Sequence, residues 1–377
     1  MSSQRSALID SAKGLACAAI VWHHLAFYGT MPDAARGVLP GVIDWLVEYA
    51  RMAVQVFLVL GGYLAAASLA PRGRARLDRP GLRIARRFMR LVVPYAVALV
   101  VVMLVTEALR PWFHDPALSG EPGLWQLVAH ALLLQGITGQ ESLSAGVWYV
   151  AIDFQLYLLT VLLFWAAWRG AARLRTYWPR LPRGLTLAQL LVVALAAASL
   201  LHFNRDAAWD NWALYFFGAY GLGMMAWWAV HAPRAAQAWG WALLMALLVL
   251  LALALQWRTR VALAGCAALV LIGAARTAAL AAWQGWAPLS RLGQMSYSVF
   301  LVHFAVCLLA NAAFERLWPG DATAALAGMA LAFGLSLLAG RVLYRRVERH
   351  VPTWLVMLRW EVAMIGAGLL AARVALA

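Results

Sequence analysis

Apolar runs long enough to cross a lipid bilayer recur along the whole 377-residue chain. A helix needs about 20 mostly apolar residues to cross about 30 Å of hydrocarbon. We predict ten such helices, at residues 8–28, 52–70, 90–109, 145–168, 186–202, 212–231, 239–257, 261–281, 295–316 and 324–344. Inside a bilayer the backbone polar groups must be satisfied within the protein, and helices do this. The chain is therefore predicted to be an all-α, polytopic membrane helix bundle.

Composition supports a membrane protein and argues against a soluble one. Hydrophobic residues make up 64% of the chain and charged residues 12%, where a soluble domain has about 25% charged residues. The formal net charge of +15 would suggest nucleic acid in a soluble protein, but no motif here interleaves basic with aromatic residues. We expect no nucleic-acid partner. The three cysteines lie inside apolar runs without metal-ligand spacing, so we expect small buried residues and no metal.

Arginine placement predicts the topology, because cytoplasmic loops carry an excess of Lys and Arg. Seven arginines lie between residues 72 and 87, after the second predicted span, and five lie between 169 and 183, after the fourth. We therefore place the N-terminus in the cytoplasm. The expected location is a bacterial inner (plasma) membrane. Residues 1–353 are expected to form one membrane domain, with 354–377 as an apolar extension, either an eleventh span or a surface helix. A helix on the outer surface is expected at 123–138.

The first predicted span carries ionisable residues on one face. Lys13 and His24 are eleven residues apart, so at about 100° per residue they share a helix face, roughly 16 Å apart along the axis. Asp10 falls near the same stripe. Ionisable groups inside a membrane helix are expensive and usually mark a functional path. We therefore predict that this face is the centre of the chemistry, with His23 pointing away into packing.

Polar and aromatic residues also gather at the outer end of the fourth predicted span. Asp153 and Tyr157 are one helical turn apart, Gln155 lies between them, and Trp148 lies just before them. The depth of Asp153 is similar to that of His24, so the two side chains are predicted to come together. An interfacial cap for Asp153, and packing or belt positions for Tyr157 and Trp148, are the structural alternatives.

Two further features have both a structural and a functional interpretation. Four arginines form a helical cluster before Pro94: Arg83, Arg86, Arg87 and Arg90. Membrane topology accounts for such a cluster, and so does phosphate binding, because guanidinium pairs with phosphate bidentately. His303, near the middle of the ninth span, is either a hydrogen-bonded core histidine or part of a channel for the donor.

In their order along the chain, these motifs resemble acyltransferase family 3, a family of multi-pass membrane enzymes. The resemblance covers roughly residues 8–353 and rests on Lys13 with His24, Gly61 with Gly62, Arg87 and Arg90 before Pro94, Trp148 with Asp153, Gln155 and Tyr157, the run Ser296-Tyr297-Ser298 to His303, and Glu348 with Pro352. Asp153 stands where many members carry glutamate, and Lys13 where many carry arginine.

The resemblance implies transfer of an acyl group, commonly acetyl from acetyl-CoA, to a hydroxyl of an extracytoplasmic glycan, glycolipid or related acceptor. On that basis His24, Asp153 and Lys13 are the expected catalytic residues. The expected donor-binding residues are Arg83, Arg86, Arg87, Arg90 and His303, and the expected substrate-binding residues are Trp148, Gln155 and Tyr157. A neutral imidazole at His24 suits proton acceptance from the attacking hydroxyl. The partners expected are acyl-CoA, the sugar acceptor and membrane lipid.

Two other classes of protein fit the same ionisable residues. A secondary transporter or flippase for a glycan or lipid precursor would use Lys13, His24 and Asp153 as a substrate or proton relay. It would move its substrate without consuming acyl-CoA. A structural subunit of an envelope-assembly complex would keep its activity after His24→Ala.

Overall fold

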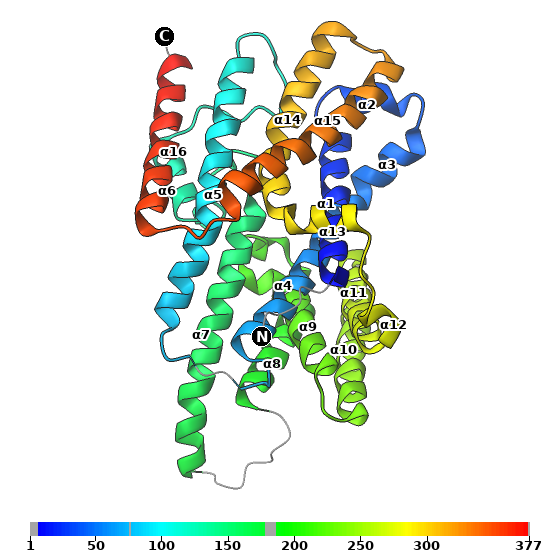
Figure 1. The fold of residues 1–377 in the computed structure, drawn as a ribbon, viewed down its shortest axis with the longest axis vertical. Coiled ribbons are helices and arrows are strands. Elements are labelled where there is room, and N and C mark those ends of the chain that lie inside the picture. Colours follow the sequence, from blue (N-terminus) through cyan, green and yellow to red (C-terminus); the bar gives the residue numbers. More distant parts are fainter. Residues whose placement is uncertain (1–6, 75–76, 178–185, 376–377) are drawn as a thin grey trace. The chain divides into compact units, whose positions relative to one another are not determined.

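The computed structural model describes residues 7–74, 77–177 and 186–375, and these residues form helices and connecting loops without a strand (Figure 1). Arg76 and residues 178–185, part of the arginine-rich loops used for topology, lie outside the described residues. The all-α prediction is confirmed. The chain divides into two compact units, the first made of Met1–Ala53, Phe88–Ala151 and Gly285–Ala377, the second of Val54–Arg87 and Ile152–Gln284.

The helices of the first unit are α1 (Ala7–Phe27), α2 (Met31–Arg36), α3 (Pro40–Glu48), η1 (Ala50–Ala53), α6 (Leu124–Ala131), α13 (Ala287–Gln294), α14 (Ser296–Leu317), α15 (Ala322–Leu343), η4 (Tyr344–Glu348) and α16 (Trp354–Ala375). Those of the second are α4 (Val54–Leu69), α8 (Leu187–Leu201), η2 (Phe203–Arg205), η3 (Ala207–Trp209), α9 (Ala213–Val230), α10 (Ala235–Leu255), α11 (Thr259–Arg276) and α12 (Ala278–Ala281). Two long helices, α5 (Pro80–Leu109) and α7 (Trp148–Tyr177), contribute residues to both units.

Ten helical segments of the described chain are long and apolar enough to cross a membrane. Nine correspond to predicted spans two to ten, and the tenth is Trp354–Arg373, in the C-terminal extension. The first predicted span forms the 21-residue helix α1 but is not among the ten. The physical reason is its composition, since Asp10, Lys13 and two histidines lower its apolar character while its length is sufficient.

Contacts between α1 and α14 show that the two helices run side by side in the same direction. His24 of α1 contacts His303 of α14, and four residues further along α1 the carbonyl of Tyr28 accepts a hydrogen bond from Asn311. Because contact positions advance together along both helices, the pair is parallel. α1 therefore packs against α14, one of the ten helices that are apolar and long enough to cross a membrane.

Small residues let the start of α1 touch α13 closely. A Cβ atom on Gly293 would lie 1.7 Å from the carbonyl oxygen of Asp10, and one on Gly14 would lie 2.2 Å from that of Leu289. No side chain fits at either place. The segment around Gly293 therefore fixes the position of the start of α1, the helix that carries His24.

In the second unit, glycines permit the same close contact between α4 and α9. A Cβ atom on Gly62 would lie 1.8 Å from the carbonyl oxygen of Tyr220, and one on Gly223 would lie 1.9 Å from that of Val59. Glycines in membrane helices commonly permit such close approach. The glycine-rich stretch of α9 thus serves helix packing.

The surface helix predicted at 123–138 is shorter than expected. α6 ends at Ala131, and Leu133 then adopts a left-handed backbone conformation with φ +56°. A non-glycine residue in that region interrupts a right-handed helix. Residues 132–147 form a connection of turns and bends to α7 instead.

Candidate active site

The centre of the candidate site is a pair of buried histidines, His24 on α1 and His303 on α14. His24 Nδ1 lies 2.5 Å from His303 Nε2. The ring centroids are 4.8 Å apart and the ring planes differ by 7°. Since the two nitrogens are much closer than the centroids and the planes are nearly parallel, the rings meet edge to edge in the geometry of an N–H···N hydrogen bond.

The neighbours of His303 determine where the protons of this pair lie. His303 Nδ1 is 2.7 Å from the carbonyl oxygen of Phe300, and a carbonyl only accepts, so Nδ1 carries the hydrogen. His303 Nε2 is then an acceptor, and His24 Nδ1–H donates to it. By this network the neutral His24 keeps its lone pair on Nε2. The arrangement leaves His24 as a base with a fixed tautomer.

Gly146 brings backbone close to the His24 ring. A Cβ atom at this position would lie 3.5 Å from His24 Cε1 and 3.0 Å from Phe300 Cζ. Its φ of +81° is one that residues with side chains rarely adopt. Cε1 is the ring atom between the two nitrogens, so the segment just before α7 approaches the nitrogen-bearing edge of the His24 ring.

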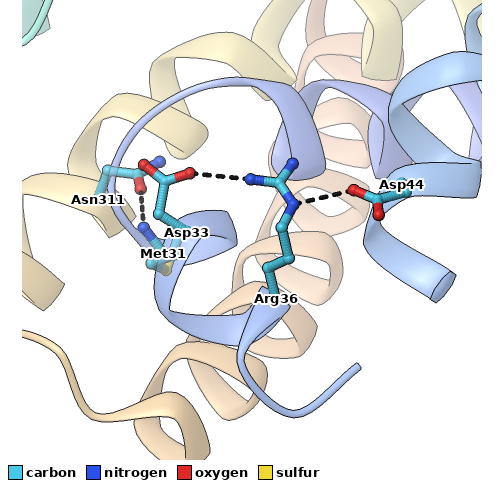
Figure 2. A network of polar contacts seen from close by, with 5 residues as sticks. All are labelled: Met31, Asp33, Arg36, Asp44 and Asn311. Atoms are coloured by element: carbon cyan, nitrogen blue, oxygen red, sulfur yellow. Dashed lines mark hydrogen bonds and ion pairs between the residues drawn. The ribbon is translucent and has the colours of Figure 1, made fainter. Parts of the chain in front are cut away.

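Asn311 of α14 holds the turn that follows α1 (Figure 2). Its Oδ1 accepts from the backbone N–H of Met31 at 3.0 Å, and its Nδ2 donates to the carbonyl of Tyr28 at 3.2 Å. Figure 2 also shows Arg36 paired with Asp33 and Asp44. The nitrogen–oxygen distances of these two pairs are 3.2 and 2.9 Å. Those ion pairs are exposed and contribute little, whereas the Asn311 bonds fasten the end of α1 to α14.

A carboxylate caps the start of α14. Glu348 Oε2, at the end of η4, accepts from the backbone N–H of Ser298 at 3.1 Å and from its hydroxyl at 2.5 Å. The N-terminus of a helix favours negative charge because its first N–H groups are free to donate. Tyr297 adds a hydrogen bond from its hydroxyl to the carbonyl of Leu91, at 2.8 Å. These contacts set the position of the helix that presents His303.

Lys13 lies on α1, half-buried, and the unbroken helix confirms that it shares a face with His24. Its predicted catalytic role stays a prediction. His23, next to His24, directs Nδ1 to the carbonyl of Leu46 at 3.1 Å. The prediction that His23 serves packing agrees with that contact.

In the second unit a residue that we predicted to bind the donor contacts a residue that we predicted to be catalytic. Arg87 of α5 pairs with Asp153 of α7 at 2.5 Å, and its guanidinium lies 5.5 Å from the ring centre of Tyr157. Arg83, Arg86 and Arg90 of the same helix are exposed. Asp153 belongs to the second unit and His24 to the first, so the predicted meeting of these two side chains stays a prediction, as do the donor-binding roles of the arginines and His303.

Gln155 holds the start of α9. Its Oε1 accepts from the backbone N–H of Ala213 at 3.0 Å, and its Nε2 donates to the carbonyl of Asn211 at 3.2 Å. The Gln155 side chain therefore caps the N-terminus of α9. Trp148 is the first residue of α7 and is partly exposed. The substrate-binding roles predicted for Trp148, Gln155 and Tyr157 stay predictions.

Within the described residues, no group of three His, Cys, Asp or Glu side chains is arranged to hold a metal ion. Cys17 and Cys307 are buried, as predicted. Cys266 is exposed, and the prediction of a buried residue is wrong there. An apolar run does not show which side of a helix faces a neighbour, and Cys266 lies on the outward side of α11.

Sequence reasoning missed Gly146 and Asn311. The signal for Asn311 was a polar residue inside an apolar span, about two helical turns after His303. Gly146 lies two residues before Trp148, and a glycine at the start of a functional segment marks a place where backbone must come close.

The fold and the histidine pair define the class: a multi-pass helical membrane protein with two hydrogen-bonded histidines buried among its helices. A family model described as an acyltransferase domain matches residues 7–341, nearly the whole chain. The chain belongs to acyltransferase family 3 and is a membrane acyltransferase. Comparison with curated proteins and with solved structures gave no significant match.

Proposed function

We propose that this protein transfers an acyl group, acetyl in the simplest case, from cytoplasmic acyl-CoA to a hydroxyl of an extracytoplasmic glycan, glycolipid or related envelope acceptor. The observation that carries the proposal is the hydrogen-bond chain from His24 through His303 to the Phe300 carbonyl. A buried imidazole with its lone pair directed away from this chain is suited to take a proton from a hydroxyl. The proposed location is a bacterial inner membrane with the N-terminus in the cytoplasm.

In the proposed reaction the acceptor oxygen attacks the thioester carbonyl carbon while His24 Nε2 takes the hydroxyl proton. A C–O bond forms, the C–S bond breaks, and the CoA sulfur leaves with a proton returned by His24. The imidazolium formed on the way is stabilised because Nδ1–H already donates to His303. His303 in turn donates to a carbonyl, which favours positive charge along the chain.

The charged groups of α5 and α1 supply the proposed donor contacts. Arg83, Arg86 and Arg90 are exposed and suited to the phosphates of CoA. Lys13, on the same face of α1 as His24, is proposed to hold a phosphate or the pantetheine arm. Asp153 pairs with Arg87. In this proposal the ion pair positions the helix segment that carries the arginine cluster.

Radiolabelled acetyl-CoA, offered to the purified protein in lipid nanodiscs with a panel of methyl glycosides, tests the proposal. Loss of a general base typically lowers the rate by about 10²- to 10⁴-fold. We expect His24→Ala to lose glycoside labelling by a factor in this range. His23→Ala is the matched control, because it removes the neighbouring imidazole and should keep transfer. Transfer at the wild-type rate by His24→Ala contradicts the mechanism.

A further inference from the structure

The connection between α6 and α7 contains two buried polar atoms that have no hydrogen-bond partner among the described residues. They are Gln135 Oε1 and Ser144 Oγ. The side chains that carry them are almost fully buried, with 1% and 3% of each residue exposed. Nearly all buried polar groups in folded proteins are hydrogen-bonded, and each exception needs a reason.

Both residues belong to the same connection as Gly146, whose backbone approaches the His24 ring. Gln135 Nε2 lies 3.5 Å from the carbonyl of Val147, the residue after Gly146. Gly146 is the residue whose backbone borders His24 Cε1. Ser144 is two positions before Gly146, and its neighbour Leu143 is fixed because its backbone N–H donates to His130 Nε2 at 3.2 Å.

The same connection contains strained backbone. Leu133 has φ +56°, a conformation that costs energy for a residue with a branched side chain. Such strain persists where the surrounding structure holds it, and it clusters at binding and catalytic sites. Two unpartnered polar atoms and one strained residue thus lie within one short connection, and that connection borders the proposed base.

We propose that Gln135 Oε1 and Ser144 Oγ form the subsite that binds hydroxyl groups of the acyl acceptor beside His24. This inference rests on the proposed function. Gln135 Oε1 accepts a hydrogen bond from one hydroxyl of the acceptor, and Ser144 Oγ both accepts and donates. Both groups are neutral, so the subsite suits a neutral polyol such as an uncharged sugar ring.

Aromatic rings beside Gly146 fit the same class of acceptor. Phe300 contacts the position of a Cβ on Gly146, and Tyr149 packs edge-on against Phe300 with ring centroids 5.8 Å apart. A sugar presents apolar C–H faces as well as hydroxyls. Polar atoms and aromatic rings along one connection therefore match its two kinds of surface.

The test measures acceptor and donor KM separately in nanodiscs, with labelled acetyl-CoA and methyl glycosides. The variants are Ser144→Ala and Gln135→Met, which remove the unpartnered atoms with little change of volume. We expect the glycoside KM to rise by about tenfold, the effect of losing one hydrogen bond to a substrate. The acetyl-CoA KM should not change. The thermal unfolding midpoint of Ser144→Ala should stay or rise, because an unpartnered polar group contributes no stability. Gln135→Met also loses the hydrogen bonds of Nε2 and should unfold at a slightly lower temperature. Ser144→Thr keeps the hydroxyl and should restore the acceptor KM.

Thr106→Val is the matched control. Thr106 Oγ1 is also buried without a partner, but it lies on α5 outside the connection, so its loss should leave the glycoside KM unchanged. An unchanged glycoside KM in Ser144→Ala and Gln135→Met, with the wild type active, overturns the subsite and leaves the proposed function intact. A lower unfolding midpoint together with equal changes in both KM values shows a structural role and also overturns it. A wild type that labels no glycoside overturns both proposals.

Discussion

At the scale of single residues, the basicity of His24 depends on hydrogen bonds that its neighbours make. The Phe300 carbonyl fixes the proton of His303, and His303 then fixes that of His24. Without the second imidazole, His24 would be free to carry its hydrogen on either nitrogen, and the ring would lose its main restraint. A second residue that orients a base often affects the rate as strongly as substrate contacts do.

His303→Phe should therefore lower kcat while leaving the protein folded. We expect a fall in kcat of about 10- to 100-fold, since orientation and tautomer are lost but the base remains. The acetyl-CoA KM should stay within about twofold if His303 acts only through His24, because KM then reports binding that the substitution does not touch. His303→Gln, whose amide oxygen can accept from His24 Nδ1–H, should recover part of the rate. A selective rise in the acetyl-CoA KM would instead support the role in donor binding that the sequence suggested.

At the scale of elements, the site depends on how α14 is fixed at its two ends. Glu348 caps the first turn, and Asn311 fastens the later turns to the end of α1. Both contacts join segments distant in the chain. The His24 to His303 distance is thus controlled by helix placement as well as by the two side chains.

Glu348→Ala should destabilise this arrangement. It leaves the Ser298 N–H without its acceptor and removes a negative charge from the N-terminus of α14. We expect the free energy of unfolding to fall by about 1–3 kcal/mol, measured by thermal unfolding in nanodiscs. Glu348→Gln keeps an acceptor oxygen and should lose less. Asp321→Ala removes a side-chain cap from the solvent-exposed start of α15 and should reduce stability without reducing acetyl transfer per folded molecule.

At the scale of the whole molecule, buried polar groups link stability to pH. His130 on α6 donates from Nδ1 to the Gln126 carbonyl at 2.8 Å and accepts at Nε2 from the Leu143 N–H. Both ring nitrogens are hydrogen-bonded in the neutral form. A second proton would have to bind at Nε2, which already faces the Leu143 N–H donor. Burial lowers the pKa of His130 from 6.5 to about 4.

The sign of the pH effect follows from that pKa. Between pH 6.5 and 4 the unfolded chain binds a proton at His130 and the folded protein does not, so stability falls as pH falls through this range. The full contribution is on the order of 3 kcal/mol. His130→Gln should weaken the dependence of the unfolding midpoint on pH between 6.5 and 4, while His114→Gln, at an exposed position, should leave it as in the wild type. Equal pH profiles for wild type and His130→Gln would contradict the assignment.

The sequence by itself determined the properties that depend on local pattern. Apolar length specified nine of the ten apolar spans, and the spacing from Lys13 to His24 placed both on one helix face. The ordered motifs led to the family, which the match over residues 7–341 then showed. Periodicity and hydropathy act over a few turns, so they are readable without knowing what each helix packs against.

Only the tertiary structure decided which residues meet. His24 and His303 are 279 positions apart, and the Glu348 contact with Ser298, the Arg87 pair with Asp153 and the approach of Gly146 to the His24 ring are also long-range. A helical pattern gives the direction of a side chain relative to its own axis, but not the neighbour on that side. The neighbour is set by close helix packing, as at Gly14 and Gly293, and by caps on distant segments. For that reason the sequence singled out His24 and His303 but did not show that their side chains meet.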